Sequence, residues 1–215
     1  MSTISRRGNR IKVLGDLHRS NFFLANLHHA VELKGYNDIV LDMEECTSAF
    51  PDSMLQICSQ ITAYRQAGIE VSLIPPKGDK LNRLIKNTNW AYLIDPRRFD
   101  PSTYKGASRI PATGYASPRE QQKVVNQIID VVLGSLPDPS RHDIAAFEWC
   151  LNEITDNVLV HSNSPIGGLI QVSTFKKQKK VVQFVVADAG IGIPQSLRAG
   201  HPSISSDTDA LDRAI

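Results

Sequence analysis

The chain has 215 residues, of which 41% are hydrophobic, and it carries a formal net charge of +2. This apolar content suffices for a packed core and excludes a wholly disordered chain, while the nearly balanced charge argues against nucleic acid as a partner. No apolar run approaches the roughly 18–20 residues needed to span a bilayer, so we expect a soluble, cytoplasmic protein without membrane contact.

The first periodic region, residues 10–95, alternates predicted strands with predicted helices. Short apolar runs predict the strands, and a 3.6-residue apolar period predicts the helices, the first two of which end at Gly35 and Gly68. Strands alternating with helices indicate an α/β fold with a mostly parallel sheet under a cover of helices. The expected strands are residues 11–14, 38–43, 69–74 and 91–94, and the expected helices are residues 21–33, 54–67 and 81–88.

A proline-rich segment, residues 96–117, separates this region from a second periodic one. Its composition predicts a linker or an extended arm docked on a neighbour. We therefore expect one domain at 1–95 and another at 118–215. In the second domain, helices are expected at 119–136 and 143–161, and strands at 169–175 and 181–187, joined by a lysine-rich hairpin turn at 176–180.

Glu153 and Asn157 stand four residues apart on the predicted helix 143–161 and so share one helical face. Mg²⁺ prefers oxygen ligands and keeps several waters, so one carboxamide oxygen can suffice to hold it. The nearby carboxylate can orient or deprotonate an attacking water. Taken alone, the same spacing also occurs on exposed helices that have no chemical role.

The predicted strand 181–187 runs directly into the segment Asp-Ala-Gly-Ile-Gly-Ile-Pro, which begins at Asp188. A carboxylate at the end of a buried strand is costly unless it is paired, and here it can accept a hydrogen bond from the exocyclic amine of adenine. Gly190 and Gly192 lack a Cβ, so the backbone can approach a base or a ribose closely. The alternative is a glycine turn with a capping aspartate. A dinucleotide-binding motif is not expected, because it requires a third glycine that this segment does not have.

The order of these features resembles the histidine-kinase/gyrase/chaperone ATPase superfamily. The match covers residues 141–197: a helix with Glu-x-x-x-Asn matches the family's N box, and after a β-hairpin, Asp-x-Gly-x-Gly matches its first glycine box. Asp156 and His161 also stand where the family often has them. The resemblance implies that 118–215 is the N-terminal part of a Bergerat-type α/β-sandwich domain that binds ATP and Mg²⁺. It also implies roles for five residues: Asn157 as the Mg²⁺ ligand, Glu153 as the general base, Asp188 as the adenine-reading carboxylate, and Gly190 and Gly192 as the residues that shape the pocket.

The chain departs from that family in two respects. The segment that closes the family's pocket is not found, and the sequence stops in a predicted helix at Ile215, so we expect a fragment of a longer protein. The predicted helix 119–136 has no histidine, and His142 is followed by Asp-Ile-Ala. A histidine-phosphotransfer role is therefore not expected.

The segment from Val40 to Leu55, together with 67–76, resembles anti-sigma-factor-antagonist (STAS) domains. In that family the serine that follows the aspartate can be phosphorylated by a partner kinase of the ATPase type found downstream. Ser53 is the matching position and is therefore a candidate phosphosite. The alternative is that Asp52 or Ser53 simply caps the helix predicted at 54–67.

Together the two resemblances imply a Mg-ATP-binding regulatory protein of the anti-sigma-factor/serine-kinase-like type with a fused STAS-like domain. Such a protein would act in signal transduction, with a regulatory protein partner or as a homo-oligomer. Two alternatives stay open, namely a conformational ATPase and a nucleotide-binding interaction module without turnover. Glu153 is compatible with all three, so the sequence does not decide between ATPase and protein serine kinase.

Overall fold

The protein is described by a computed structural model covering residues 3–104, 109–135, 140–176, 180–201 and 203–214. It contains two β-sheets, one in an N-terminal region (residues 3–94) and one in a C-terminal region (residues 109–214). The predicted α/β class is confirmed. Within the described residues, no helix is long and apolar enough to cross a membrane.

The N-terminal region is built on a mostly parallel sheet, as expected. Its strands are β1 (Thr3–Arg7), β2 (Arg10–Leu17), β3 (Asp38–Asp42), β4 (Cys46–Ala49) and β5 (Glu70–Ile74). The order is β1-β2-β3-β5 with β4 paired to β2, and only the β1–β2 pairing is antiparallel. Ile11, Val13 and Leu17 of β2 point to the same face and are buried, because helices cover that face of the sheet.

Five helical segments accompany this sheet. They are α1 (Asn21–His28) with its π-helical continuation η1 (His29–Leu33), α2 (Pro51–Gln66), α3 (Asp79–Asn87) and α4 (Trp90–Ile94). The strand predicted at 91–94 is wrong, because these residues form α4. Asn89 takes a left-handed conformation (φ 66°) just before the helix, and Trp90, Ala91 and Ile94 are buried. So short an apolar run does not distinguish a strand from a buried helix.

The start of α2 also differs from the expectation. The helix begins at Pro51, its N-cap residue is Phe50, and no side chain makes a capping hydrogen bond. Proline suits the first helical position because its fixed φ is helical and because a backbone N–H at that position would have no partner within the helix. The predicted capping role of Asp52 or Ser53 is therefore wrong, since both residues lie inside the first turn.

The C-terminal region is an antiparallel sheet in the order β6-β7-β8. Its edge strand β6 comes from the proline-rich segment, which matches a docked arm rather than a free linker. Of the lysine-rich turn predicted between β7 and β8, residues 177–179 lie outside the described residues. The elements are β6 (Arg109–Tyr115), α5 (Pro118–Leu133), α6 (Arg141–His161), β7 (Gly168–Lys176), β8 (Lys180–Asp188), α7 (Gly192–Gly200) and α8 (Asp207–Ala214).

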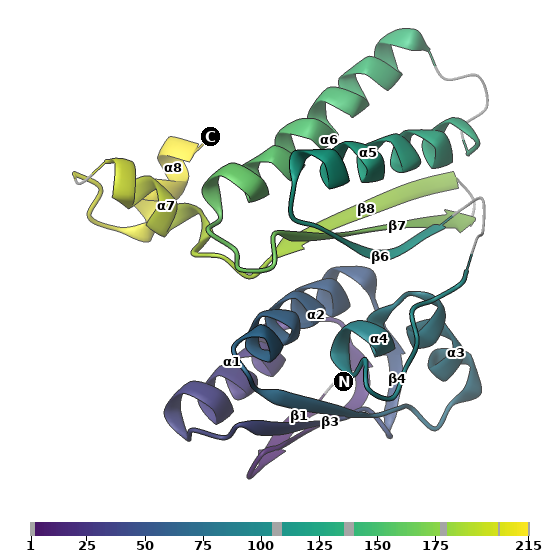
Figure 1. The fold of residues 1–215 in the computed structure, drawn as a ribbon, viewed down its shortest axis with the longest axis vertical. Helices are drawn as coiled ribbons and strands as arrows, with labels where there is room; N and C mark the ends of the chain where they lie inside the picture. The colour runs from purple at the N-terminus through teal and green to yellow at the C-terminus, as the bar shows by residue number, and fades with distance from the viewer. Residues whose placement is uncertain (1–2, 105–108, 136–139, 177–179, 202, 215) are drawn as a thin grey trace.

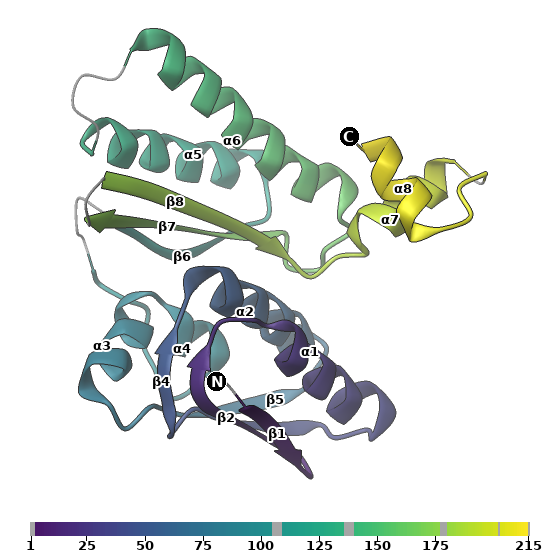
Figure 2. The ribbon, with the colours of Figure 1, turned by 180° about the vertical axis from the view of Figure 1, so that it is seen from behind.

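The C-terminal sheet is covered on both faces, by different parts of the chain. Helices α5 and α6 pack on one face, and α2 of the N-terminal region packs against β7 and β8 on the other (Figures 1 and 2). Ala112, Leu169 and Ala187 of this sheet belong to the same buried apolar cluster as the N-terminal core. The two regions thus share one continuous core through α2.

Hydrogen bonds from α4 and α2 add to that contact. The Nε1–H of Trp90 donates to Oε1 of Gln171 on β7 over 2.7 Å, and both side chains are buried. The hydroxyl of Ser59 on α2 shares its donation between the backbone carbonyl oxygens of Gln56, at 2.9 Å, and Asp188, at 3.1 Å. Because the Trp90–Gln171 bond is shielded from water, it ties α4 firmly to β7, and the Ser59 contact adds a link from α2 to the end of β8.

Candidate nucleotide-binding site

A cavity of about 650 Å³ lies between the end of α6, the end of β8 and the helices α7 and α8. Asn157 and Asp188, which the sequence places on different elements, both line it. Apolar side chains from α6, β8 and α7 form part of the wall, and about half of the lining residues are polar or charged. The lining residues are Ile154, Asn157, Val158, His161, Ser162, Val186, Asp188, Gly192, Ile193, Ser196, Leu197 and Arg213.

Helix α6 presents the predicted pair Glu153 and Asn157 on its exposed side. The opposite side carries Leu151, Thr155 and Val158, which are buried. The helix starts at a Ser140 cap, where the hydroxyl accepts from the backbone N–H of Asp143 over 3.1 Å. The apolar period of the sequence thus fixes which side of α6 is free for a ligand.

Thr155 fixes the rotation of α6 through contacts that the sequence did not reveal. Its hydroxyl donates to the carbonyl of Leu151 and accepts from Nε2 of Gln121 on α5 over 2.8 Å. The hydroxyl of Tyr115, at the end of β6, reaches the carbonyl of Thr155 over 3.5 Å. Burial, followed by the charges of Asp188 and Asp156, raises the pKa of the Tyr115 hydroxyl, so it stays neutral and donates.

Asp188 ends β8 and is half-buried. Its Oδ1 accepts a hydrogen bond from the backbone N–H of Gly190 over 2.8 Å, so the carboxylate also supports the glycine turn, as the alternative interpretation expected. This bond uses one lone pair of one oxygen. A carboxylate has about four acceptor positions in all, so capacity remains for a ligand donor.

The two glycines of the motif do different things. A Cβ on Gly190 would lie 2.0 Å from the carbonyl oxygen of Ser162 at the end of α6, and the next residue, Ile191, donates its N–H to that oxygen over 2.8 Å. Gly190 therefore lets the turn seat against α6 and is not among the residues that line the cavity. Gly192 lines the cavity and has a φ of +73°, a conformation that glycine adopts without strain.

The predicted general base and the predicted metal ligand are placed differently. Asn157 lines the cavity, whereas Glu153, one turn earlier, stands on the same side of α6 outside the lining. Among the described residues, no group of three or more His, Cys, Asp or Glu side chains could hold a metal ion. The residues therefore fit Mg²⁺ only as an ion that a ligand's phosphates and waters help to coordinate.

Ser53, the candidate phosphosite, lies away from this cavity. Its side chain is 2% exposed, in the first turn of α2. Helix α2 covers the face of the C-terminal sheet opposite to α6 (Figures 1 and 2). Ser53 is not among the residues that line the cavity at the end of α6.

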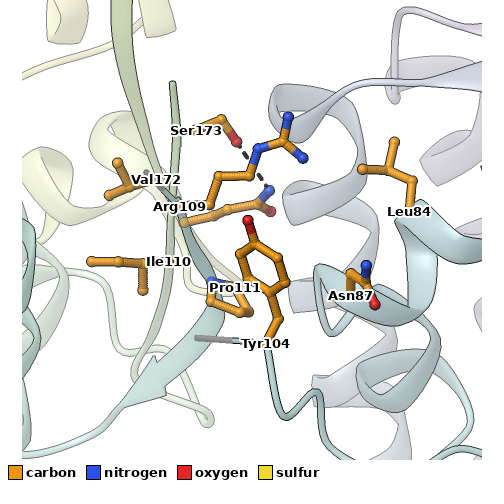
Figure 3. Close-up of a pocket in the computed structure, with 9 residues that line it drawn as sticks. Leu84, Asn87, Tyr104, Arg109, Ile110, Pro111, Val172 and Ser173 are labelled. Atoms are coloured by element: carbon orange, nitrogen blue, oxygen red, sulfur yellow. Dashed lines mark hydrogen bonds between the residues drawn. The ribbon is translucent and has the colours of Figure 1, made fainter. Parts of the chain in front are cut away.

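A second, much smaller cavity of about 40 Å³ lies where the two regions meet (Figure 3). Its walls come from α3, from β6 with the segment before it, and from β7, where Nε2 of Gln171 donates to the hydroxyl of Ser173 over 3.5 Å. Tyr104 and Arg109 extend across it. A space of this size holds a few water molecules and no organic ligand.

Comparison of the chain with models of protein families, with curated proteins and with solved structures found no match. The case for a function therefore comes from the sequence motifs and from the cavity that their residues line.

Proposed function

We propose that the cavity beside α6 binds Mg-ATP, and that the protein is an ATP-binding regulator of the anti-sigma-factor/serine-kinase-like type with a fused STAS-like domain. One observation carries the proposal. Asn157 and Asp188, which the sequence selects independently for metal binding and for adenine recognition, line a single cavity. Its volume of about 650 Å³ falls within the roughly 300–1,000 Å³ typical of small-molecule sites.

The chemistry of the lining supports an adenine nucleotide. Ile154, Val158 and Val186 offer apolar contact to a heteroaromatic base, and Asp188 offers an acceptor to its exocyclic amine. Asn157 would hold Mg²⁺ together with the phosphates. When bound, the ion would neutralise phosphate charge.

Glu153 is assigned the proton-accepting role in this proposal. Its carboxylate would take the proton of the attacking group, which is water in an ATPase and a protein hydroxyl in a kinase. One turn of helix separates it from Asn157, so it would stand near an ion held there while lying outside the lining. This placement outside the lining also favours a second candidate function, a module that binds nucleotide without turnover.

Titration of the protein with ATP, with and without Mg²⁺, tests the binding proposal. We expect Asp188→Asn to weaken the affinity for ATP at least about tenfold. An amide lacks the negative charge, and its own N–H donor can face the amine donor of adenine. Asp130→Asn, an exposed change on α5 away from the cavity, should bind ATP as the wild type does. Absence of ATP binding by the wild type would overturn the proposal, and undiminished affinity in Asp188→Asn would remove Asp188 from it.

Turnover separates the two candidate functions. Asn157→Ala should weaken Mg-ATP, whereas Glu153→Ala should keep ATP and lose turnover by about 10²–10⁴-fold. Release of free phosphate and formation of phosphoprotein are measured separately. If the wild type binds ATP and neither product forms with any candidate partner, the binding-module function stands instead.

A further inference from the structure

Arg213 is a charged residue of the cavity that the sequence motifs do not include. It belongs to the last turn of α8, and its side chain lines the cavity together with Asp188 of β8. Over the described ranges, Arg213 forms no ion pair or hydrogen bond. The cavity thus contains one carboxylate and one guanidinium that do not neutralise each other.

The position of Arg213 follows from how α8 is held. Arg198 on α7 forms an ion pair with Asp207 in the first turn of α8, and Ser206 accepts from the backbone N–H of Asp209. Ile204 and Ala210 are buried between these helices and their surroundings. Because Arg198 is already paired, Arg213 is the guanidinium of this helix pair that remains available for a ligand.

We propose that Arg213 binds the phosphates of the ligand and that the site therefore selects nucleoside di- and triphosphates over nucleosides. The inference rests on the proposed function, because it assigns the ligand's anionic end to the same cavity. A guanidinium presents donors in a planar fork that matches two phosphate oxygens, and it is always charged. Asp188 would bind the base at the opposite chemical end of the same molecule.

The side chains beside Arg213 agree with an anionic ligand. Ser196 of α7 and His161 at the end of α6 line the same cavity, and both can donate to phosphate oxygens. By contrast, Asp188 is the sole carboxylate among the lining residues described. The guanidinium and the neutral donors outnumber this single carboxylate, which favours a ligand with more negative charge than adenosine.

Binding of ATP, ADP and adenosine to the full chain tests the proposal. Arg213→Ala should weaken ATP about 10–100-fold and leave adenosine unchanged, since only the phosphates lose a charged partner. Arg213→Lys should recover part of the ATP affinity, because it restores charge without the fork. Arg119→Ala, an exposed change in the first turn of α5 outside the cavity, is the matched control.

The outcomes separate this inference from the proposed function. The affinity of the wild type for ATP should fall with added salt more steeply than that of Arg213→Ala. If Arg213→Ala binds ATP as tightly as the wild type while Asp188→Asn does not, the role of Arg213 is overturned and the nucleotide site stands. If the wild type binds neither ATP nor adenosine, both proposals are overturned. Circular dichroism confirms that each variant is folded.

Discussion

The two regions of the molecule differ in how completely they fill their interior. In the N-terminal region, helices and sheet enclose side chains such as Phe23, Leu27 and Met54 with no exposure to solvent. In the C-terminal region, side chains such as Val125 and Ile170 are buried as completely, but a cavity of about 650 Å³ opens at the end of α6. Protein interiors are normally close-packed, so the unfilled volume marks where this chain has room for a ligand.

The difference does not make the two regions independent. Helix α2 belongs to the N-terminal core and also covers the back of the C-terminal sheet, so the well-packed region supports the open one. Ser59 reaches the carbonyl of Asp188, the residue assigned to the base. The candidate site at the end of α6 and β8 is thus supported by the close packing of α2 against the C-terminal sheet.

The largest loss of stability is expected when a buried side chain at the boundary between the two regions is removed. Trp90→Ala should lower the free energy of unfolding by about 3–5 kcal/mol, because it empties a core position and leaves Oε1 of Gln171 buried without its donor. Urea unfolding followed by circular dichroism measures this. Trp149→Ala, which removes a side chain that is 65% exposed, should change the same quantity by less than about 0.5 kcal/mol. Equal costs for the two variants would contradict a shared core.

A smaller loss of stability is expected from a substitution where the glycine turn meets the end of α6. Gly190→Ala places a methyl group against the backbone of Ser162, which cannot move freely, so we expect a cost of about 1–3 kcal/mol and weaker ATP binding. Gly200→Ala is the control, since nothing lies within 4 Å of its added Cβ. Melting temperature and ATP titration are measured for both. Similar behaviour of the two variants would show that the turn tolerates a side chain.

Ser59→Ala should cost about 1 kcal/mol, the usual net value of one hydrogen bond, because its hydroxyl reaches the carbonyl oxygens of Gln56 and Asp188. Ser72→Ala on β5 is the comparison, because its hydroxyl is half-buried and makes only a long contact of 3.5 Å to the carbonyl of Ile39. Chemical denaturation gives both values. A cost for Ser59→Ala no larger than that for Ser72→Ala would mean that this bond does not hold β8 in place.

The smallest effect is expected at Ser53. Because its hydroxyl is buried and makes no capping bond, Ser53→Ala should cost less than the roughly 0.5–2 kcal/mol of a lost cap. Ser53 is buried and does not line the cavity, so incubation of the chain with ATP should leave this residue unmodified. Phosphate at Ser53, mapped by mass spectrometry, would show that the first turn of α2 opens to a kinase.

Local patterns predicted the elements that carry the candidate site. The four-residue spacing placed Glu153 and Asn157 on one face of the predicted helix, and the apolar run followed by the glycine motif placed Asp188 at the end of a strand. Both features depend on neighbours a few residues away, so the sequence reveals them. Their meeting in one cavity was implied by the family resemblance and not by any local rule.

The features that were missed depend on partners far along the chain. Strand β6 hides in a proline-rich segment because β7 supplies its hydrogen bonds. A Cβ on Gly168 would lie 2.4 Å from the ring of Tyr115, a contact that no pattern near Gly168 indicates. Arg213 was missed for the same reason, since only the packing of α7 and α8 brings it to the cavity.

The hydrogen bond between Trp90 and Gln171 has an optical consequence. The chain has two tryptophans, Trp90 at the boundary between the regions and Trp149 on the outer side of α6. A water-soluble quencher such as iodide reaches Trp149 and is kept from Trp90, so the fluorescence that survives quenching comes from the boundary. A red shift of that remaining emission would signal water entering between α4 and β7, without any label attached to the protein.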